Sequence, residues 1–296
     1  MGDIVITEAG FGADLGAEKF LDIKCPYGNL FPHAVVIVAT IRALKMHGGV
    51  KKADLNEENV EAVNAGFVNL AKQVENIRAF GLPVLVAINK FASDTPAEIE
   101  KLLQKCDSYG VDVSLNECWE KGGDGGIDMA KQIATMVEGT DFKPTTMYDK
   151  EESIPAKLTK IVQKIYGGDG VEFTANAKKQ IKQLEDWGLD KLPVCIAKTQ
   201  YSLSDNPALL GAPKDFNITV QDVRIANGAG LSFARPAISW LCRAYLRNRR
   251  PSIWISMRTA KSPVYSKISL QKFMHTELNW EETHGIKSFI RRSIYQ

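Results

Sequence analysis

The 296-residue sequence lacks several features that would assign it to a class of protein. It contains no run of about 20 apolar residues, so we expect no membrane-spanning helix. Its N-terminus, MGDIVITEAG, has no basic stretch followed by an apolar one, so we expect no secretory signal. The five cysteines show no CxxC spacing and the four histidines are equally scattered, which argues against a zinc site. Such a cysteine set favours reduced thiols and a cytoplasmic location.

Sequence motifs for several ligand classes are missing as well. The chain contains no G-x-x-x-x-G-K-[ST] phosphate-binding loop, and the stretch EAGFGADLG does not match the G-x-G-x-x-G pattern of nicotinamide sites. INKFASD is similar to the N-K-x-D guanine-reading motif, but Ala92 stands where that motif has an acid. No Ser/His/Asp triad stands out. The sequence therefore contains none of these common motifs for a nucleotide-binding or acyl-transfer site.

Charge is distributed unevenly along the chain. Residues 231–296 contain 12 Lys and Arg, 3 Glu and no Asp, whereas residues 1–230 contain 25 Lys and Arg and 32 Asp and Glu. A basic tail on an acidic body is typical of an appended nucleic-acid arm. With Trp240 and Trp254 it also suits a helix lying on a membrane surface.

The body alternates apolar, β-rich runs with amphipathic segments. Near-continuous Val, Ile and Leu runs predict buried strands over 3–10, 33–41, 82–91, 111–117 and 192–199, and 215–227 is predicted as a more antiparallel strand. Helices are predicted over 56–80, 95–108, 126–138, 153–166 and 173–187, the last with Thr174 as N-cap and Gly188 at its end. This alternation predicts an α/β fold of mainly parallel sheets with flanking helices.

Ligands of such folds collect beyond the carboxyl ends of the strands. Phe91 and Trp119 follow two consecutive strands, so their rings are candidates to sandwich a flat heterocycle, each stacking contact contributing about 1 kcal/mol. The alternative is that each ring folds back onto the core. Lys198 and His47 follow other strands and have structural alternatives too. The glycines of EAGFGADLG, beside Glu8 and Asp14, fit either an anion site or a tight strand-to-helix turn.

Six stretches resemble the formate–tetrahydrofolate ligase family in order and sequence. They are TEAGFGADLGAEKF, VATIRALKMHGGV, VAINKFASDT, WEKGGDGG, IYGGDGVEFTANA and LPVCIAKTQYSLSDNP, and the resemblance spans residues 3 to about 230. The resemblance implies a P-loop NTPase-like fold and the ATP-dependent joining of formate to tetrahydrofolate. In that reaction formate attacks the γ-phosphate to give formyl phosphate, which then acylates the folate N10 amine.

The resemblance also implies roles for individual residues. Phe91 and Trp119 match the aromatic residues that hold the pterin, and Leu115 matches a residue lining the same pocket. Glu8, Asp14, Lys45 and His47 fall in cleft segments and are catalytic candidates, and Lys198 is a nucleotide-binding candidate. The implied small molecules are ATP with Mg²⁺, formate, tetrahydrofolate and a monovalent cation. The family resemblance further implies a homo-oligomer in the cytoplasm, with neither nucleic acid nor membrane as partner.

Two departures qualify what the resemblance implies. Family members are about twice as long as this body and carry a phosphate loop in their N-terminal half, so the fold is expected to be incomplete. The predicted domains are therefore the remainder of a nucleotide-binding domain over 1–81, a folate-side domain over 82–230 and a non-native tail over 231–296. We expect no ligase activity from this chain alone. The alternative function is a non-catalytic folate-binding or interaction fragment, which in a split enzyme would act together with a separate N-terminal half.

The basic tail has its own explanation under this resemblance. Family members continue after NGAG with a segment of the type F-I-V-x-P-x-T-G. With suitable synonymous codons, adding one T before the codons of LSFARPAISW makes them read F-I-V-R-P-T-G-D-I-M. We therefore interpret residues 231–296 as out-of-frame translation, which sequencing of the encoding DNA would test.

Overall fold

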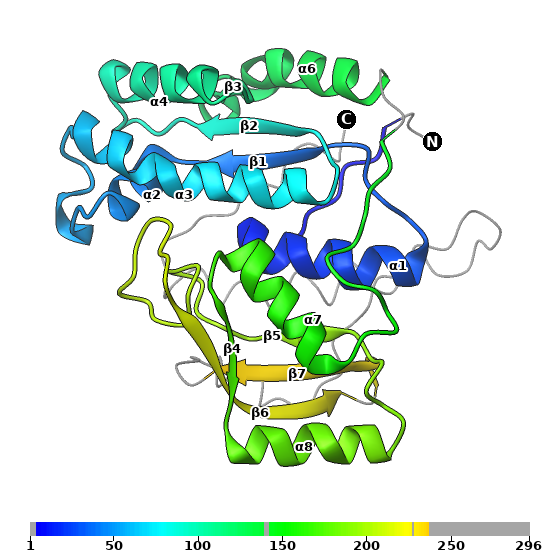
Figure 1. Cartoon of the computed structure of the whole chain (residues 1–296). Coiled ribbons are helices and arrows are strands. Elements are labelled where there is room, and N and C mark those ends of the chain that lie inside the picture. Colours follow the sequence, from blue (N-terminus) through cyan, green and yellow to red (C-terminus); the bar gives the residue numbers. More distant parts are fainter. Residues whose placement is uncertain (1–3, 139–141, 227, 237–296) are drawn as a thin grey trace, which may run out of the picture. The chain divides into compact units, whose positions relative to one another are not determined.

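The computed structural model describes residues 4–138, 142–226 and 228–236 (Figure 1). The chain divides into two units, Met1–Cys242 and Arg243–Gln296, and all described residues belong to the first. The predicted out-of-frame tail beyond residue 236 thus lies outside the described residues. The helices are η1 Gly12–Ala17, η2 Phe20–Lys24, α1 Cys25–Gly28, α2 Ile41–His47, η3 Lys52–Asp54, α3 Val60–Ala79, α4 Pro96–Ser108, α5 Cys118–Lys121, η4 Gly122–Gly126, α6 Ile127–Glu138, α7 Ile154–Ile161, η5 Val162–Tyr166 and α8 Ala175–Asp186.

The first sheet contains three parallel strands in the order β1-β2-β3. They are β1 Val35–Ala39, β2 Val84–Asn89 and β3 Asp112–Asn116, at the positions that the apolar runs predicted. The central strand β2 is buried over Val84–Ile88, as its continuous apolar run requires. Parallel neighbours need crossover connections, and α3 and α4 supply them.

The second sheet is mixed and has the strand order β4-β6-β7-β5. Its strands are β4 Gly170–Phe173, β5 Val194–Ile196, β6 Asn217–Ala226 and β7 Leu231–Pro236. Strand β6 runs parallel to β4 and antiparallel to β7, so the prediction of an antiparallel strand at 215–227 is confirmed. Strand β7 is parallel to β5. The two sheets with their helices confirm the α/β class.

Local sequence signals place the helix ends. Thr95 caps α4 through a capping box, in which its hydroxyl accepts from Glu98 N while the Glu98 carboxylate accepts from Thr95 N. Thr174 caps α8 through Ala177 N, and Gly188 follows the helix with a φ of 67°. Both caps were readable from the sequence because they depend only on neighbouring residues.

The predicted strand over 3–10 is wrong. Residues 4–10 form neither helix nor strand, and the side chains of Ile4, Val5 and Ile6 are 47, 75 and 83% exposed. No described strand pairs with them. A β-rich composition yields a strand only where a neighbouring strand supplies hydrogen-bond partners. The predicted glycine loop after it is instead the π-helical segment η1.

The strand pairing bears on the predicted organisation of the chain. Strand β5, which precedes Lys198, belongs to the second sheet, whereas Phe91 and Trp119 follow strands of the first. The predicted domain boundary at 81/82 falls between β1 and β2, which pair, and the boundary at 230/231 falls between β6 and β7, which also pair. The division into nucleotide and folate parts stays a prediction.

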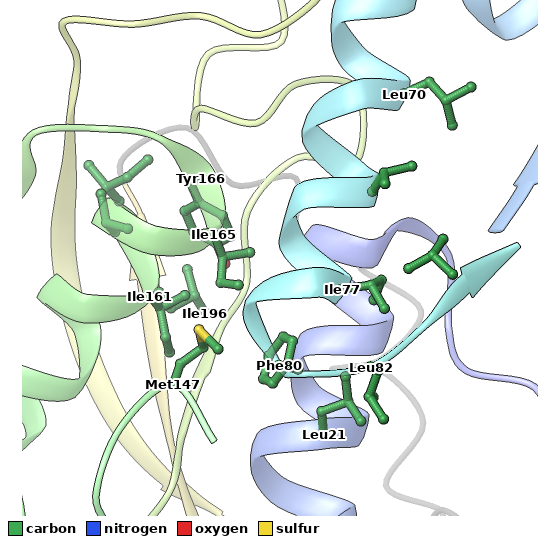
Figure 2. Packing of buried hydrophobic residues seen from close by; sticks show 14 of the residues in the cluster. Leu21, Leu70, Ile77, Phe80, Leu82, Met147, Ile161, Ile165, Tyr166 and Ile196 are labelled. Atoms are coloured by element: carbon green, nitrogen blue, oxygen red, sulfur yellow. The ribbon is translucent and has the colours of Figure 1, made fainter. Parts of the chain in front are cut away.

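One apolar cluster joins the helices to both sheets. Figure 2 shows Leu70, Ile77 and Phe80 of the α3 segment on one side of this cluster and Ile161, Ile165 and Tyr166 of α7 and η5 on the other. Ile77, Phe80, Ile161, Ile165 and Tyr166 have fully buried side chains. Packing of this kind holds the loops at the strand ends in place.

Candidate functional site

Phe91 and Trp119 follow the carboxyl ends of neighbouring parallel strands. Strand β2 ends at Asn89 and β3 ends at Asn116, and these two residues are partners in the strand register. The Asn116 side-chain amide donates to Asn89 Oδ1 at 2.5 Å. The two rings are 45 and 70% exposed and make no ring contact with each other within the part of the chain that the structure describes. Neither residue belongs to the buried apolar cluster or to the partly buried residues packed against it.

The turn at Phe91 is held by Asp94. Phe91 N donates to Asp94 Oδ2 at 2.9 Å, and Asp94 N donates to Phe91 O at 3.0 Å. Burial raises the pKa of the Asp94 carboxyl, and the bond from Phe91 N opposes that shift. Residue 92 in this turn is an alanine, whose backbone is not restrained as a proline would be. The Asp94 bonds supply a restraint at the same place.

The turn at Trp119 begins a four-residue helix, α5 Cys118–Lys121. Asn116 Oδ1 accepts from Cys118 N at 3.1 Å, and Glu117 N donates to Gly125 O at 3.1 Å. Gly125 packs so tightly here that a Cβ on it would lie 2.4 Å from the Glu117 carbonyl carbon. The glycines of KGGDGG therefore let the following loop pack against the start of α5. Leu115, half-buried in β3, lies just before this turn.

Asp14 and Lys198, predicted as a catalytic and a nucleotide-binding residue, form a buried ion pair. Lys198 Nζ lies 2.6 Å from Asp14 Oδ2 and also donates to Ser202 O at 2.5 Å and Thr199 O at 3.2 Å. The same ammonium lies 4.8 Å from the centre of the Tyr166 ring. Burial lowers the pKa of Lys198, and the charge of Asp14 opposes that shift. With three acceptors in place, Lys198 has no free N–H to offer a phosphate.

Lys45 is likewise committed to a buried pair. Its Nζ lies 2.8 Å from Glu98 Oε1, both side chains are fully buried, and it donates to Glu57 O at 2.9 Å. Glu98 in turn accepts from Asn59 N at 2.8 Å, so the pair joins the start of α3 to the start of α4. The arrangement is structural and does not present Lys45 to a ligand.

His47 is partly buried and hydrogen-bonded, whereas Glu8 is exposed. His47 Nδ1 accepts from Gly211 N at 3.2 Å, while Asn69 Nδ2 donates to Gly211 O at 2.8 Å. Burial lowers the pKa of His47, opposed by the charge of Asp14. Glu8 has an exposed side chain in the irregular segment before η1. The structure thus places Phe91 and Trp119 after neighbouring parallel strands, with Leu115 in the second of them. It pairs Asp14 with Lys198 and places Lys45 and His47 in separate contacts.

Sequence reasoning missed the residues that support the aromatic pair. Asp94, Glu117, Asn89 and Asn116 were not singled out, although each strand ends in an asparagine and a T-x-x-E capping signal follows Asp94. These signals were readable, but their partners belong to a neighbouring strand or turn.

The described residues contain no group of three or more His, Cys, Asp or Glu side chains arranged to hold a metal ion. Cys25, Cys106, Cys118 and Cys195 are free thiols. Over the described ranges no helix is long and apolar enough to cross a membrane.

Comparison with protein families decides the assignment. The model of the family described as formate–tetrahydrofolate ligase matches residues 1–237. The chain belongs to the formate–tetrahydrofolate ligase family. This confirms the resemblance seen in the sequence, and it makes the chain a member of a family of ligases that join formate to tetrahydrofolate with ATP. The match to formate–tetrahydrofolate ligase ends one residue after β7, so residues 238–296 lie beyond it.

Proposed function

We propose that this chain binds the pterin ring of tetrahydrofolate between Phe91 and Trp119, with Leu115 contributing to the same pocket. The observation that carries this proposal is the pair of exposed aromatic side chains at adjacent carboxyl ends of parallel strands. Exposed aromatic rings so placed offer large apolar faces to a flat heterocycle at small entropic cost. Family membership supplies the heterocycle.

The reaction of the family needs more than this pocket. ATP supplies the phosphoryl group that converts formate to formyl phosphate, and the folate N10 amine then takes the formyl group. The residues of this chain do not fit the ATP phosphates, because the sequence has no phosphate-binding loop and both Lys45 and Lys198 are held in buried ion pairs. Among the described residues no cluster of three or more carboxylate, thiol or imidazole groups is arranged to hold Mg²⁺. Glu8, Asp14 and His47 are kept as candidates for the formate side of the cleft.

We propose that the chain binds folate and does not by itself synthesise 10-formyltetrahydrofolate. The second candidate function, catalysis of the whole ligation, is favoured by the match to the ligase family over residues 1–237. A coupled assay separates the two, since synthesis that depends on both ATP and formate would establish catalysis. A cytoplasmic location, a homo-oligomeric assembly and small-molecule partners without nucleic acid or membrane complete the proposal.

Binding is tested by titration calorimetry of the full 296-residue chain with tetrahydrofolate under anaerobic conditions and with folic acid. We expect Phe91→Ala and Trp119→Ala each to raise Kd at least about fivefold, since one stacked ring contributes about 1 kcal/mol. Trp187→Ala is the matched control, because Trp187 is also exposed (59%) but follows α8 in the second-sheet region. Equal effects of all three substitutions would contradict the proposed pocket.

A further inference from the structure

The spacing between Phe91 and Trp119 is set by the turns that carry them. Because the rings make no contact with each other within the described ranges, the distance between them is not determined by a contact between the two side chains. Three hydrogen bonds join the two turns: Asn116 Nδ2 to Asn89 Oδ1, Lys90 N to Asn116 O at 3.2 Å, and Lys90 Nζ to Glu117 Oε1 at 2.7 Å. Lys90 Nζ also forms a longer ion pair with Glu120 Oε2 at 3.7 Å. Of these contacts, the shorter one between side chains beyond the strand ends is the bond from Lys90 to Glu117.

Glu117 joins both turns through its carboxylate. Its Oε1 accepts from Lys90, the residue before Phe91, and its Oε2 accepts at 2.5 Å from Lys121, the last residue of α5. The Glu117 side chain is only 17% exposed, against 31% for Lys90 and 51% for Lys121. Hydrogen bonds from Lys121 and then Lys90 lower the pKa of Glu117, so the carboxylate is ionised at neutral pH.

Helix α5 cannot hold Trp119 in place without such ties. Four residues are far below the length at which a helix is stable alone. Asn116 Oδ1 accepts from the backbone N–H of Cys118, the first residue of α5. The last residue, Lys121, pairs with Glu117 across one turn, and Glu117 N donates to Gly125 O. Glu117 therefore takes part in two of these three contacts, and it also makes the shorter of the two ion pairs that connect α5 and its N-cap to Lys90.

We propose that Glu117 is a positioning residue for the pterin site. Its carboxylate, which is bonded to both Lys90 and Lys121, fixes helix α5 relative to the Phe91 turn. The distance between the Phe91 and Trp119 rings is thereby set for a planar ring system before the ligand binds. This inference rests on the proposed folate function. Glu117 does not contact the ligand itself, and its effect on binding passes through the placement of the rings.

The test compares Glu117→Gln, which keeps the shape and removes the charge, with Glu152→Gln. Glu152 forms an ion pair of similar length and exposure with Lys160, 2.5 Å apart, and it is remote in sequence from both turns. Each full-length variant is titrated with folic acid and labelled with 5-fluorotryptophan for ¹⁹F NMR. The Trp119 signal is assigned by its loss in Trp119→Phe.

We expect Glu117→Gln to raise the Kd for folic acid about three- to tenfold, the range of a partly screened ion pair with two partners. It should also shift or broaden the Trp119 signal and leave the Trp187 signal in place. Glu117→Asp, which keeps the charge on a shorter side chain, should fall between wild type and Glu117→Gln. Glu152→Gln should change neither readout.

The outcomes separate this inference from the function on which it rests. If the wild-type chain binds folic acid and Glu117→Gln changes neither Kd nor the Trp119 signal, the positioning role is overturned and the folate proposal stands. A shifted signal with an unchanged Kd also overturns it. If the wild-type chain does not bind folate, the proposed function fails, and an unaltered Trp119 signal in Glu117→Gln then overturns the positioning role independently.

Discussion

Asp14 and Lys198 are 184 positions apart in the sequence, yet their charged atoms lie 2.6 Å apart in the interior. The pair joins the π-helical segment η1 to the loop after β5, and the Lys198 side chain is fully buried. Gln73 of α3 adds two bonds to Asp14, one from its amide to Oδ1 at 3.1 Å and one accepted from Asp14 N at 3.0 Å. These contacts join three distant parts of the chain at one point.

We predict that Lys198→Met lowers the free energy of unfolding by about 3–5 kcal/mol, because it leaves the Asp14 carboxylate buried without its cation. Asp14→Asn should have a similar effect, and the double variant should lose less than the sum of the two. Urea denaturation at constant pH measures all three. The control Lys191→Met breaks the exposed pair with Asp190 and should change stability by less than about 0.5 kcal/mol. A near-neutral Lys198→Met would contradict a stabilising role for the buried pair.

His47 predicts a loss of stability in mild acid. Its Nδ1 accepts the Gly211 N–H, so the folded protein favours neutral imidazole, and burial lowers the pKa of His47. The unfolded chain therefore takes up the proton first as pH falls below the usual value of about 6.5, and stability declines there. The slope is at most about 1.4 kcal/mol per pH unit for one proton.

His47→Asn tests this prediction, because its side-chain oxygen can accept the same bond without titrating. The difference in unfolding free energy between wild type and variant should diminish from pH 7 to pH 5, as the wild type loses stability. A difference that stays constant over this range would contradict the assignment.

Asp22 predicts the opposite pH dependence. Burial first, and then the charge of Glu18, raise the pKa of Asp22 to about 8, and a side-chain hydrogen bond with Glu18 acts in the same direction. The folded protein therefore retains a proton that the unfolded chain releases near its ordinary pKa of about 3.8. Stability contributed by this group is fully present at acidic pH and is lost as pH rises toward 8.

Asp22→Asn should remove that dependence. Asparagine keeps the Oδ1 that accepts from Met147 N at 2.7 Å, and its amide can donate to the neighbouring carboxylate. We expect the variant to be more stable than wild type at pH 8.5, with a smaller gain at pH 6. Thermal unfolding over this range measures the effect, and an equal gain at both values would argue against a raised pKa.

Gly16 is predicted to be intolerant of a side chain. A Cβ there would lie 1.7 Å from the carbonyl oxygen of Gly10, which is backbone and cannot move alone. Gly16→Ala should therefore displace the segment before η1 and destabilise the protein by more than about 2 kcal/mol. Gly123→Ala, with no atom within 4 Å of the added Cβ, should change stability by less than about 0.5 kcal/mol. Chemical denaturation of the two variants compares them directly.

The strand predicted at 82–91 and the one predicted at 3–10 show the limits of predicting strands from local sequence pattern. Both are apolar and β-rich, but β2 has a paired strand on each side and residues 4–10 have none among the described strands. Pairing is a property of distant residues, so the sequence pattern gave the right answer for one and the wrong answer for the other. Helix caps such as Thr95 and Thr174 were predictable because both partners lie within one turn.

The same distinction between local pattern and distant partners applies to the residues of the candidate site. The placement of Phe91 and Trp119 at one edge followed from the sequence, because parallel strands that are neighbours end on the same side. The burial and ion pairing of Lys45 and Lys198 could not be predicted from the sequence, because a lysine after a strand or in a helix can face solvent, phosphate or a carboxylate. Their partners, Glu98 and Asp14, lie 53 and 184 residues away.

The sequence by itself determined the family, the α/β class, the helix caps and the two aromatic residues, because each depends on local pattern or on strand order. The tertiary structure decided which apolar runs became strands and which charged residues became buried pairs. Those outcomes depend on how far each side chain is buried and on partners that come within a few ångströms only in the folded chain. Neither the burial nor the partners can be read from the local sequence.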